Sequence, residues 1–352
     1  MTVKINTKDG QIELTDDVIA TIVGGAATEI FGVVGMAYWM LFADFSLQND
    51  AYIFVDADDT ADSVYVKLDR VAAPGHFLSF KALSAVMGYR KHIRHGRYTL
   101  TGVGTLQLFR NMRNGKQGPV AFVVPIVRTS NDLAGKLGQS FETDSATFAR
   151  AFHDPAFCAK YGVDTATIIA LFIPNTYELY WSTTPEQLMT RMKKEYDNYW
   201  TTKRKTLAKK IGLTPLQVMT LASIVEQETN DNKEKPMVAG MYLNRYKKGM
   251  RLQADPTVKY ATGKFYLHRI AGDILFTDSP YNTYKYAGVP PGPICIPSIA
   301  SIKSVLNYAH HNYFYMCAKE DFSGSHNFAE TYEEHQVNAK KYAEALNARG
   351  IK

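Results

Sequence analysis

The sequence predicts an α+β protein, with a small mixed α/β module followed by a larger and mostly helical domain. Residues 51–56, YIFVDA, alternate apolar and polar side chains as a half-buried strand does, and helical spacing follows. Residues 184–212 have the amphipathic pattern of one long helix, and a second helix begins clearly at residue 214. A chain of 352 residues is long enough to form two separate cores.

Along the small module, residues 96–125 predict a strand, a helix that carries Leu106, Leu108 and Phe109, a turn and a second strand. Residues 131–168 then have helical spacing, with Ser130 or Asn131 as the cap. Residues 172–181, FIPNTYELYW, predict an aromatic loop or a short strand. We therefore expect an N-terminal segment over 1–45, the module over 50–127 and the larger domain over 128–348.

Composition limits the classes of function. The formal net charge is +6, and basic clusters at 89–97 and 191–210 are suited either to an anionic polymer or membrane surface, or simply to solvated helix faces. The three cysteines are too few and too scattered for a disulfide framework or a metal cluster. The histidines His310, His311, His326 and His335 lack the spacing of a zinc site, so we expect neither a metal nor another cofactor.

The N-terminal segment allows two interpretations. Residues 18–43 are apolar and about long enough to span a bilayer, with Tyr38 and Trp39 near the end. Against a span, Glu29 makes insertion less favourable by about 2–4 kcal/mol, and the preceding flank is acidic rather than basic. Residues 10–36 also resemble the start of an alkaline-shock-protein domain, which is soluble. A single membrane anchor is the interpretation we favour.

The helix that begins at residue 214 ends on two carboxylates in LASIVEQETN. Thr214 is suited to cap it, Pro215 to its first turn and Gln217 to a capping box. At about 100° per residue, Glu226 lies at the margin of the apolar face and Glu228 about 200° away, so the two cannot share a proton. The small residues before Glu226 predict a half-apolar notch, which would raise its pKa and suit it to proton donation.

An ion pair to Arg245 or Arg251 is the structural alternative for Glu226. Farther along, residues 236–247 predict a helix, and a polar strip then surrounds Pro256, either as a site or as the cap of another helix. Residues 278–298 combine prolines and tyrosines, which suits stacking on sugar rings. His326 follows a Ser-Gly-Ser turn, either pointing into a cleft or as a structural histidine.

Four motifs in this order resemble the catalytic domain of the endolytic murein transglycosylases, the MltG or YceG-like family. They are LASIVEQET, MYLNRYKKGMRLQADPTVKYATG, SPYNTYKYAGVPPGPICIPSIASI and GSHNFAETYEEH. The resemblance covers about 38–348, and FIPNTYELYW and VRTSNDLAGKLG are similar to its Bacteroidota branch. It implies that the small module is LysM-like and that Glu226, in SIVE, is the catalytic acid/base. The substrate-binding residues that we expect are Gln253, Asp255, Thr257, Tyr281, Asn282, Tyr284 and His326.

The implied reaction cleaves the β-1,4 bond between N-acetylmuramic acid and N-acetylglucosamine within glycan strands, leaving 1,6-anhydro ends. The implied partners are peptidoglycan strands, peptidoglycan synthases and the membrane, with no nucleic acid. The implied location is the inner membrane, crossed once, with the catalytic domain in the periplasm. Two alternatives remain, a non-catalytic glycan-binding envelope protein and a muramidase that hydrolyses with a second carboxylate such as Asp255 or Glu228.

Overall fold

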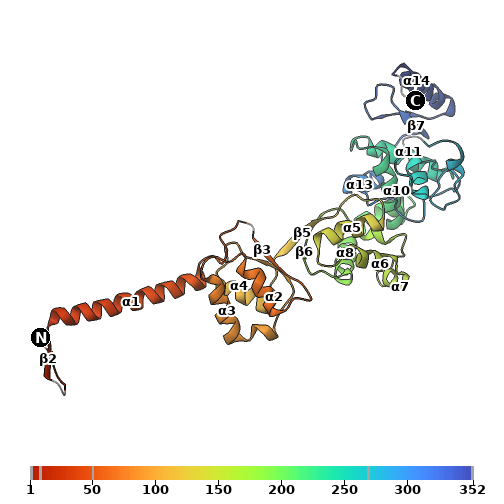
Figure 1. Ribbon diagram of the computed structural model, residues 1–352. Helices are drawn as coiled ribbons and strands as arrows, with labels where there is room; N and C mark the ends of the chain where they lie inside the picture. The colour runs from red at the N-terminus through yellow and green to blue at the C-terminus, as the bar shows by residue number, and fades with distance from the viewer. Residues whose placement is uncertain (1–2, 8–9, 50, 268–269, 350–352) are drawn as a thin grey trace. The chain divides into compact units, whose positions relative to one another are not determined.

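The structure is a computed structural model that describes residues 3–7, 10–49, 51–267 and 270–349 (Figure 1). It divides into two compact units: unit 1 comprises residues 1–119 and 180–182, and unit 2 comprises 120–179 and 183–352. The first boundary therefore follows Pro119, earlier than the boundary expected at 127 and 128. The mixture of helices and small sheets confirms the predicted α+β class.

Unit 1 contains two antiparallel strand pairs and the helices that pack on one of them. The first pair is a hairpin in which Val3 lies opposite Leu14, and the second joins Tyr52 to Thr99. The strands are β1 (Val3–Thr7), β2 (Gly10–Leu14), β3 (Tyr52–Val55) and β4 (Gly96–Thr99). The helices are α1 (Asp16–Phe42), α2 (Ala61–Asp69), α3 (His76–Met87), η1 (Tyr89–Lys91) and α4 (Thr105–Asn114).

Helix α1 is one unbroken helix of 27 residues (red in Figure 1). Its stretch Gly25–Phe42 has a mean hydropathy of 1.3, is 0% buried and is long and apolar enough to cross a membrane. Directly after it, the Phe45 side chain is fully buried with Phe80 and Phe109 in the core of unit 1. The N-terminal segment expected to end at residue 45 therefore reaches into the folded module.

Unit 2 is mostly helical. Its strands are β5 (Pro119–Val123), β6 (Thr176–Tyr180), β7 (Tyr315–Ala318) and β8 (His326–Ala329), which form the pairs β5–β6 and β7–β8. The first helices are α5 (Ser130–Ser140), α6 (Ser145–His153), α7 (Pro155–Ala159), η2 (Ile168–Leu171), α8 (Pro185–Tyr199) and α9 (Thr202–Lys210). The others are α10 (Pro215–Glu228), α11 (Lys235–Lys247), α12 (Asp255–Thr262), η3 (Gly272–Phe276), α13 (Ile299–Leu306) and α14 (Tyr332–Ala348).

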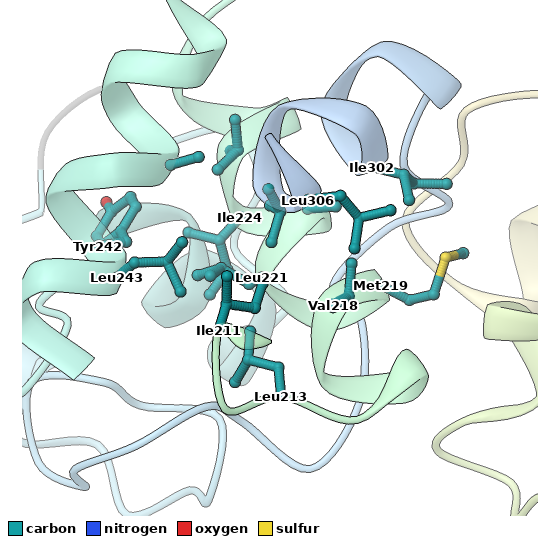
Figure 2. Close-up of a cluster of buried hydrophobic side chains, with 14 of the residues drawn as sticks. Ile211, Leu213, Val218, Met219, Leu221, Ile224, Tyr242, Leu243, Ile302 and Leu306 are labelled. Atoms are coloured by element: carbon teal, nitrogen blue, oxygen red, sulfur yellow. The ribbon is translucent and has the colours of Figure 1, made fainter. Parts of the chain in front are cut away.

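Helix α10 lies at the centre of unit 2. The Thr214 side chain accepts from the Gln217 backbone and Gln217 returns the bond, as the sequence predicted. From Val218 to Val225 every side chain is buried, because α11 and α13 pack against it. Figure 2 shows Leu221 and Ile224 of α10 together with side chains of these two neighbours. A helix buried on all sides holds its last turn in a fixed position, and that turn carries both glutamates.

Two predicted helices are interrupted. The long helix expected over 184–212 is two helices, α8 and α9, because Trp200 leaves helical geometry with its side chain buried and Thr201 caps a new helix. The helical pattern of 131–168 is likewise divided among α5, α6 and α7, and its first cap is Thr129 rather than Ser130 or Asn131. In both places the apolar spacing continues across the break, so periodicity alone did not reveal it.

Candidate active site

The two glutamates that end α10 bind different parts of unit 2. Glu226 faces α13, where its carboxylate meets Ser298 and Ser301. Glu228 instead accepts a hydrogen bond from the Tyr242 hydroxyl of α11. This separation agrees with the expectation that the two carboxyls occupy different flanks of the helix and share no proton.

Glu226 is held as a carboxylate. Its Oε2 accepts from the Ser298 backbone N–H at 3.0 Å and from the hydroxyls of Ser298 and Ser301 at 2.5 Å each. The Lys235 ammonium lies 3.2 Å from the same oxygen, and the two side chains are only 3% and 10% exposed. Burial opposes ionisation, but these hydrogen bonds and the lysine outweigh it, so the pKa of Glu226 lies below its ordinary value.

The expectation of a raised pKa at Glu226 was therefore wrong. Ser223 of the predicted notch donates to the Thr220 carbonyl and accepts from the Ile294 N–H, and the polar residues of α13 surround the carboxylate. The charged partner is Lys235 rather than Arg245 or Arg251. A low pKa makes this carboxyl a poor proton donor near neutral pH.

Glu228 has the opposite electrostatics. Burial raises its pKa to about 7, the hydrogen bond from Tyr242 works against that rise, and the Asp255 charge adds to it. A carboxyl with a pKa near neutrality exists in both protonation states under ordinary conditions. Perturbed carboxyls of this kind are common at catalytic sites, which makes Glu228 a functional-site candidate on physical grounds.

Glu228 also lines a cavity of about 360 Å³. Such a volume is within the range of small-molecule binding sites, and the walls combine aromatic faces with polar groups. Glu226 is not among the residues that line it. The lining residues are Glu228, Met241, Tyr242, Arg245, Leu252, Gln253, Asp255, Tyr284, Phe314, Tyr315, Met316, Cys317, Ala318, His326, Tyr332 and His335.

Four of the predicted binding residues meet in this cavity, namely Gln253, Asp255, Tyr284 and His326. Gln253 has a positive φ of 54°, and its side-chain oxygen accepts from the buried Arg245 guanidinium. A left-handed conformation at a residue other than glycine is strained and persists only where the surroundings hold it. The Tyr284 hydroxyl donates to the Asp255 carboxylate at 2.6 Å, which orients both groups at the cavity wall.

His326 is positioned by a carboxylate from another element. Glu234, which directly precedes α11, accepts from the His326 backbone N–H at 2.6 Å, and its other oxygen lies 3.0 Å from Nδ1. A carboxylate at Nδ1 favours the tautomer with the proton on that atom, which leaves Nε2 free to accept a hydrogen bond. The structure thus supports the cleft interpretation of His326.

The other three predicted binding residues lie outside the residues that line this cavity. Thr257 is fully buried, with its hydroxyl bonded to the Ala254 carbonyl and to Thr283. Tyr281 packs its ring against Tyr260 at a centroid distance of 4.7 Å. Asn282 is fully buried, and its amide joins three backbone groups of the proline-tyrosine segment.

Replacing Asn282 by alanine should lower the free energy of unfolding by about 1–3 kcal/mol, because the carbonyls of Leu275 and Thr277 would lose their donor. Thermal unfolding of the purified protein measures the change. The matched control is Asn307→Ala, since the Asn307 amide bonds to the exposed Lys303 carbonyl. Equal stability of both variants would show that the buried amide is not structural.

Sequence reasoning missed several residues that shape the cavity. Tyr242 and Arg245 are spaced three apart on α11 and lie on one face of an otherwise apolar helix. That spacing was a usable signal for a polar wall. Tyr315 and His335, from β7 and α14, stack with centroids 5.5 Å apart, and only the folded chain brings them together.

With this geometry established, comparisons with known proteins place the chain in a family. Residues 53–341 match the YceG-like family. The chain belongs to that family. It is 32% identical over 308 residues to the endolytic murein transglycosylase of Streptococcus pneumoniae serotype 2, a match that covers 78% of this chain and 55% of the relative. The crystal structure of the putative yceG-like protein lmo1499 of Listeria monocytogenes is 26% identical with a TM-score of 0.54, over 82% of this chain and 98% of that one.

The N-terminal part of this family member matches a second family. Residues 4–70 match the alkaline-shock-protein family, described as having a cell envelope-related function, which confirms the resemblance seen in the sequence. A stretch of 37 residues is 89% identical to the uncharacterized protein Spy1614 of Streptococcus pyogenes, covering 10% of this chain and 31% of that protein. The chain spans about half the length of the curated transglycosylases that it matches. The Bacteroidota branch stays a prediction.

Proposed function

We propose that this chain is an endolytic lytic transglycosylase that cuts peptidoglycan between N-acetylmuramic acid and N-acetylglucosamine. The observation that carries the proposal is one carboxyl, Glu228, with a pKa of about 7 at the wall of a cavity lined by aromatic and polar groups. The relative from Streptococcus pneumoniae, named an endolytic murein transglycosylase, supports the same class of reaction.

In the proposed mechanism, protonated Glu228 donates its proton to the glycosidic oxygen, and the bond from C1 of the muramyl residue to that oxygen breaks. The resulting carboxylate keeps the hydrogen bond from Tyr242. It then takes the proton of the muramyl C6 hydroxyl, whose oxygen bonds to C1 and forms the 1,6-anhydro ring. One carboxyl can serve both steps because the nucleophile belongs to the substrate, whereas hydrolysis normally needs two carboxyls.

This proposal moves the acid/base role from Glu226, the residue expected from the SIVE motif, to Glu228. Glu226 has its Oε2 occupied by two serines and a lysine, and its pKa is lowered. We assign it the role of fixing the end of α10 against α13. Glutamine variants at both positions, described in the Discussion, decide between the two assignments.

Gln253, Asp255, Tyr284 and His326 are proposed to bind the sugar and acetamido groups. Their side chains offer acceptors and donors around the carboxyl of Glu228, and each is oriented by another residue of the cavity wall or by Glu234. Groups held in this way lose little conformational freedom when substrate binds.

One observation favours hydrolysis as a second candidate function. Asp255 lines the same cavity, so a second carboxylate is available to activate water. Mass spectrometry of purified sacculi digested by the protein separates the functions. We expect 1,6-anhydro ends from internal cuts. Reducing ends would establish the muramidase instead, and intact strands would indicate a glycan-binding protein.

The rate should fall as the pH rises through about 7, because Glu228 must be protonated to start the reaction. We expect kcat/KM on soluble glycan strands to decrease about tenfold per pH unit above that value. The carboxyl of Glu226, with its lowered pKa, would instead place this limb below the ordinary glutamate range. A rate that stays constant between pH 6 and 9 would exclude Glu228 as the acid.

We further propose that α1 is a single membrane anchor that keeps the catalytic unit in the cell envelope, on the outer side of the inner membrane. The apolar stretch Gly25–Phe42 and the envelope-related description of the alkaline-shock-protein family support this location. Peptidoglycan synthases are the partners proposed for an enzyme that cuts new strands at the membrane.

A further inference from the structure

Helix α3 of unit 1 leaves an apolar face uncovered. Its buried side holds Phe80 in the core, whereas Leu78 is 68% exposed and Val86 is 87% exposed. Ala82 and Ala85 are exposed as well, and the spacing of four, seven and eight residues from Leu78 puts all of these on one side of the helix. A stripe of this kind on a helix surface requires an apolar neighbour.

This face lies directly beside the end of α1. Ala37, Met40 and Leu41 of α1 share an open apolar groove of about 360 Å³ with Ala82 and Val86, among other α3 residues. The Trp39 ring also contacts His76, the first residue of α3, at a centroid distance of 4.6 Å. The exposed faces of α1 and α3 therefore form one continuous apolar surface.

The medium around α1 indicates what covers that surface. Ile30, Phe31, Val33 and Val34 follow one another around the helix, and each is more than half exposed. A protein partner would cover one side of such a helix, whereas a bilayer surrounds all sides. The 18 residues Gly25–Phe42 are about 27 Å long at 1.5 Å per residue, slightly less than the ~30 Å hydrocarbon core. A span therefore has no apolar turn to spare, and Ala37–Leu41 must lie in the membrane.

We propose that α3 lies in the interface of an anionic bilayer, with Leu78, Ala82 and Val86 among the lipid chains. The inference rests on the proposed anchor, because α3 is at the membrane depth of the α1 residues that it touches. Exposed cationic side chains follow or interrupt the apolar stripe, namely Lys81, Lys91 and Arg94. Cations beside an apolar helix face are the pattern of a helix that binds an anionic membrane surface.

A depth measurement tests the proposal on the full chain. In a Cys317→Ser background, a cysteine is placed at one site and labelled with an environment-sensitive fluorophore, since Cys158 and Cys295 are buried. The sites are Val86→Cys on α3, Val33→Cys on α1 and, as a matched exposed control, Val66→Cys on α2. Each protein is reconstituted into vesicles of phosphatidylethanolamine and phosphatidylglycerol and floated on a density gradient.

We expect the chain to float, the label at 86 to be quenched at least twofold by shallow spin-labelled lipid, and the label at 33 by deep spin-labelled lipid. The label at 66 should keep the emission of a fluorophore in water. If the chain floats but the label at 86 behaves like the label at 66, the α3 surface is refuted and the anchor stands. If the chain does not float, the anchor and the α3 surface both fall, while the proposed catalysis is unaffected.

Discussion

Glu228→Gln should reduce cleavage of purified sacculi by about 100-fold to 10,000-fold, the usual loss when a general acid/base is removed. Glutamine keeps the shape of the side chain and can still accept the Tyr242 hydrogen bond, but it has no proton to transfer. Release of anhydro-ended fragments, measured by mass spectrometry with purified protein, gives the rate. Wild-type turnover in this variant would refute the assignment.

Stability provides the control for that loss. The folded-state pKa of Glu228, about 7, lies above its ordinary value, so the folded protein favours the neutral carboxyl. The stability that the neutral carboxyl contributes is present at acidic pH and is lost as the pH rises through about 7. Because glutamine is always neutral, the variant should unfold at a higher temperature than the wild type at pH 8 and at a similar temperature near pH 4. Inactivity with undiminished stability can then be attributed to chemistry.

How far the sequence predicts this site depends on how local each interaction is. The cap of α10 was predictable because Thr214 and Gln217 are three residues apart, and the different flanks of Glu226 and Glu228 follow from helical geometry. The environment on each flank was not predictable. The serines that ionise Glu226 come from 72 and 75 residues farther along the chain, and no periodicity in α10 indicates that α13 packs there.

The same distinction explains the binding residues. A polar side chain near a proline turn can face a substrate or hold the turn together, and its residue type is the same in both cases. Asn282 holds the turn through three backbone bonds, whereas Tyr284, two residues later, reaches the cavity. The interruption at Trp200 had a local signal that periodicity obscured, since Thr201 is a suitable cap for the helix that follows it.

Glu226→Gln should lower the stability of unit 2 rather than remove a proton donor. The Lys235 ammonium would stay buried, 3% exposed, without its carboxylate, and breaking a buried ion pair from one side costs about 3–5 kcal/mol. For a unit of this size such a loss lowers the unfolding temperature by about 6–20 °C. Differential scanning calorimetry at neutral pH measures the shift, and sacculus cleavage is assayed well below the new transition.

The double variant Glu226→Gln with Lys235→Met is the matched control. Methionine fills a similar volume without a charge, so the double variant should recover much of the lost stability. Acid gives an independent check. Because the folded pKa of Glu226 is lowered, the stability it contributes is present at neutral pH and is lost as the pH falls through that pKa. The gap between the wild type and Glu226→Gln should therefore close in acid. A stable but inactive Glu226→Gln protein, beside an active Glu228→Gln protein, would return the acid/base role to Glu226.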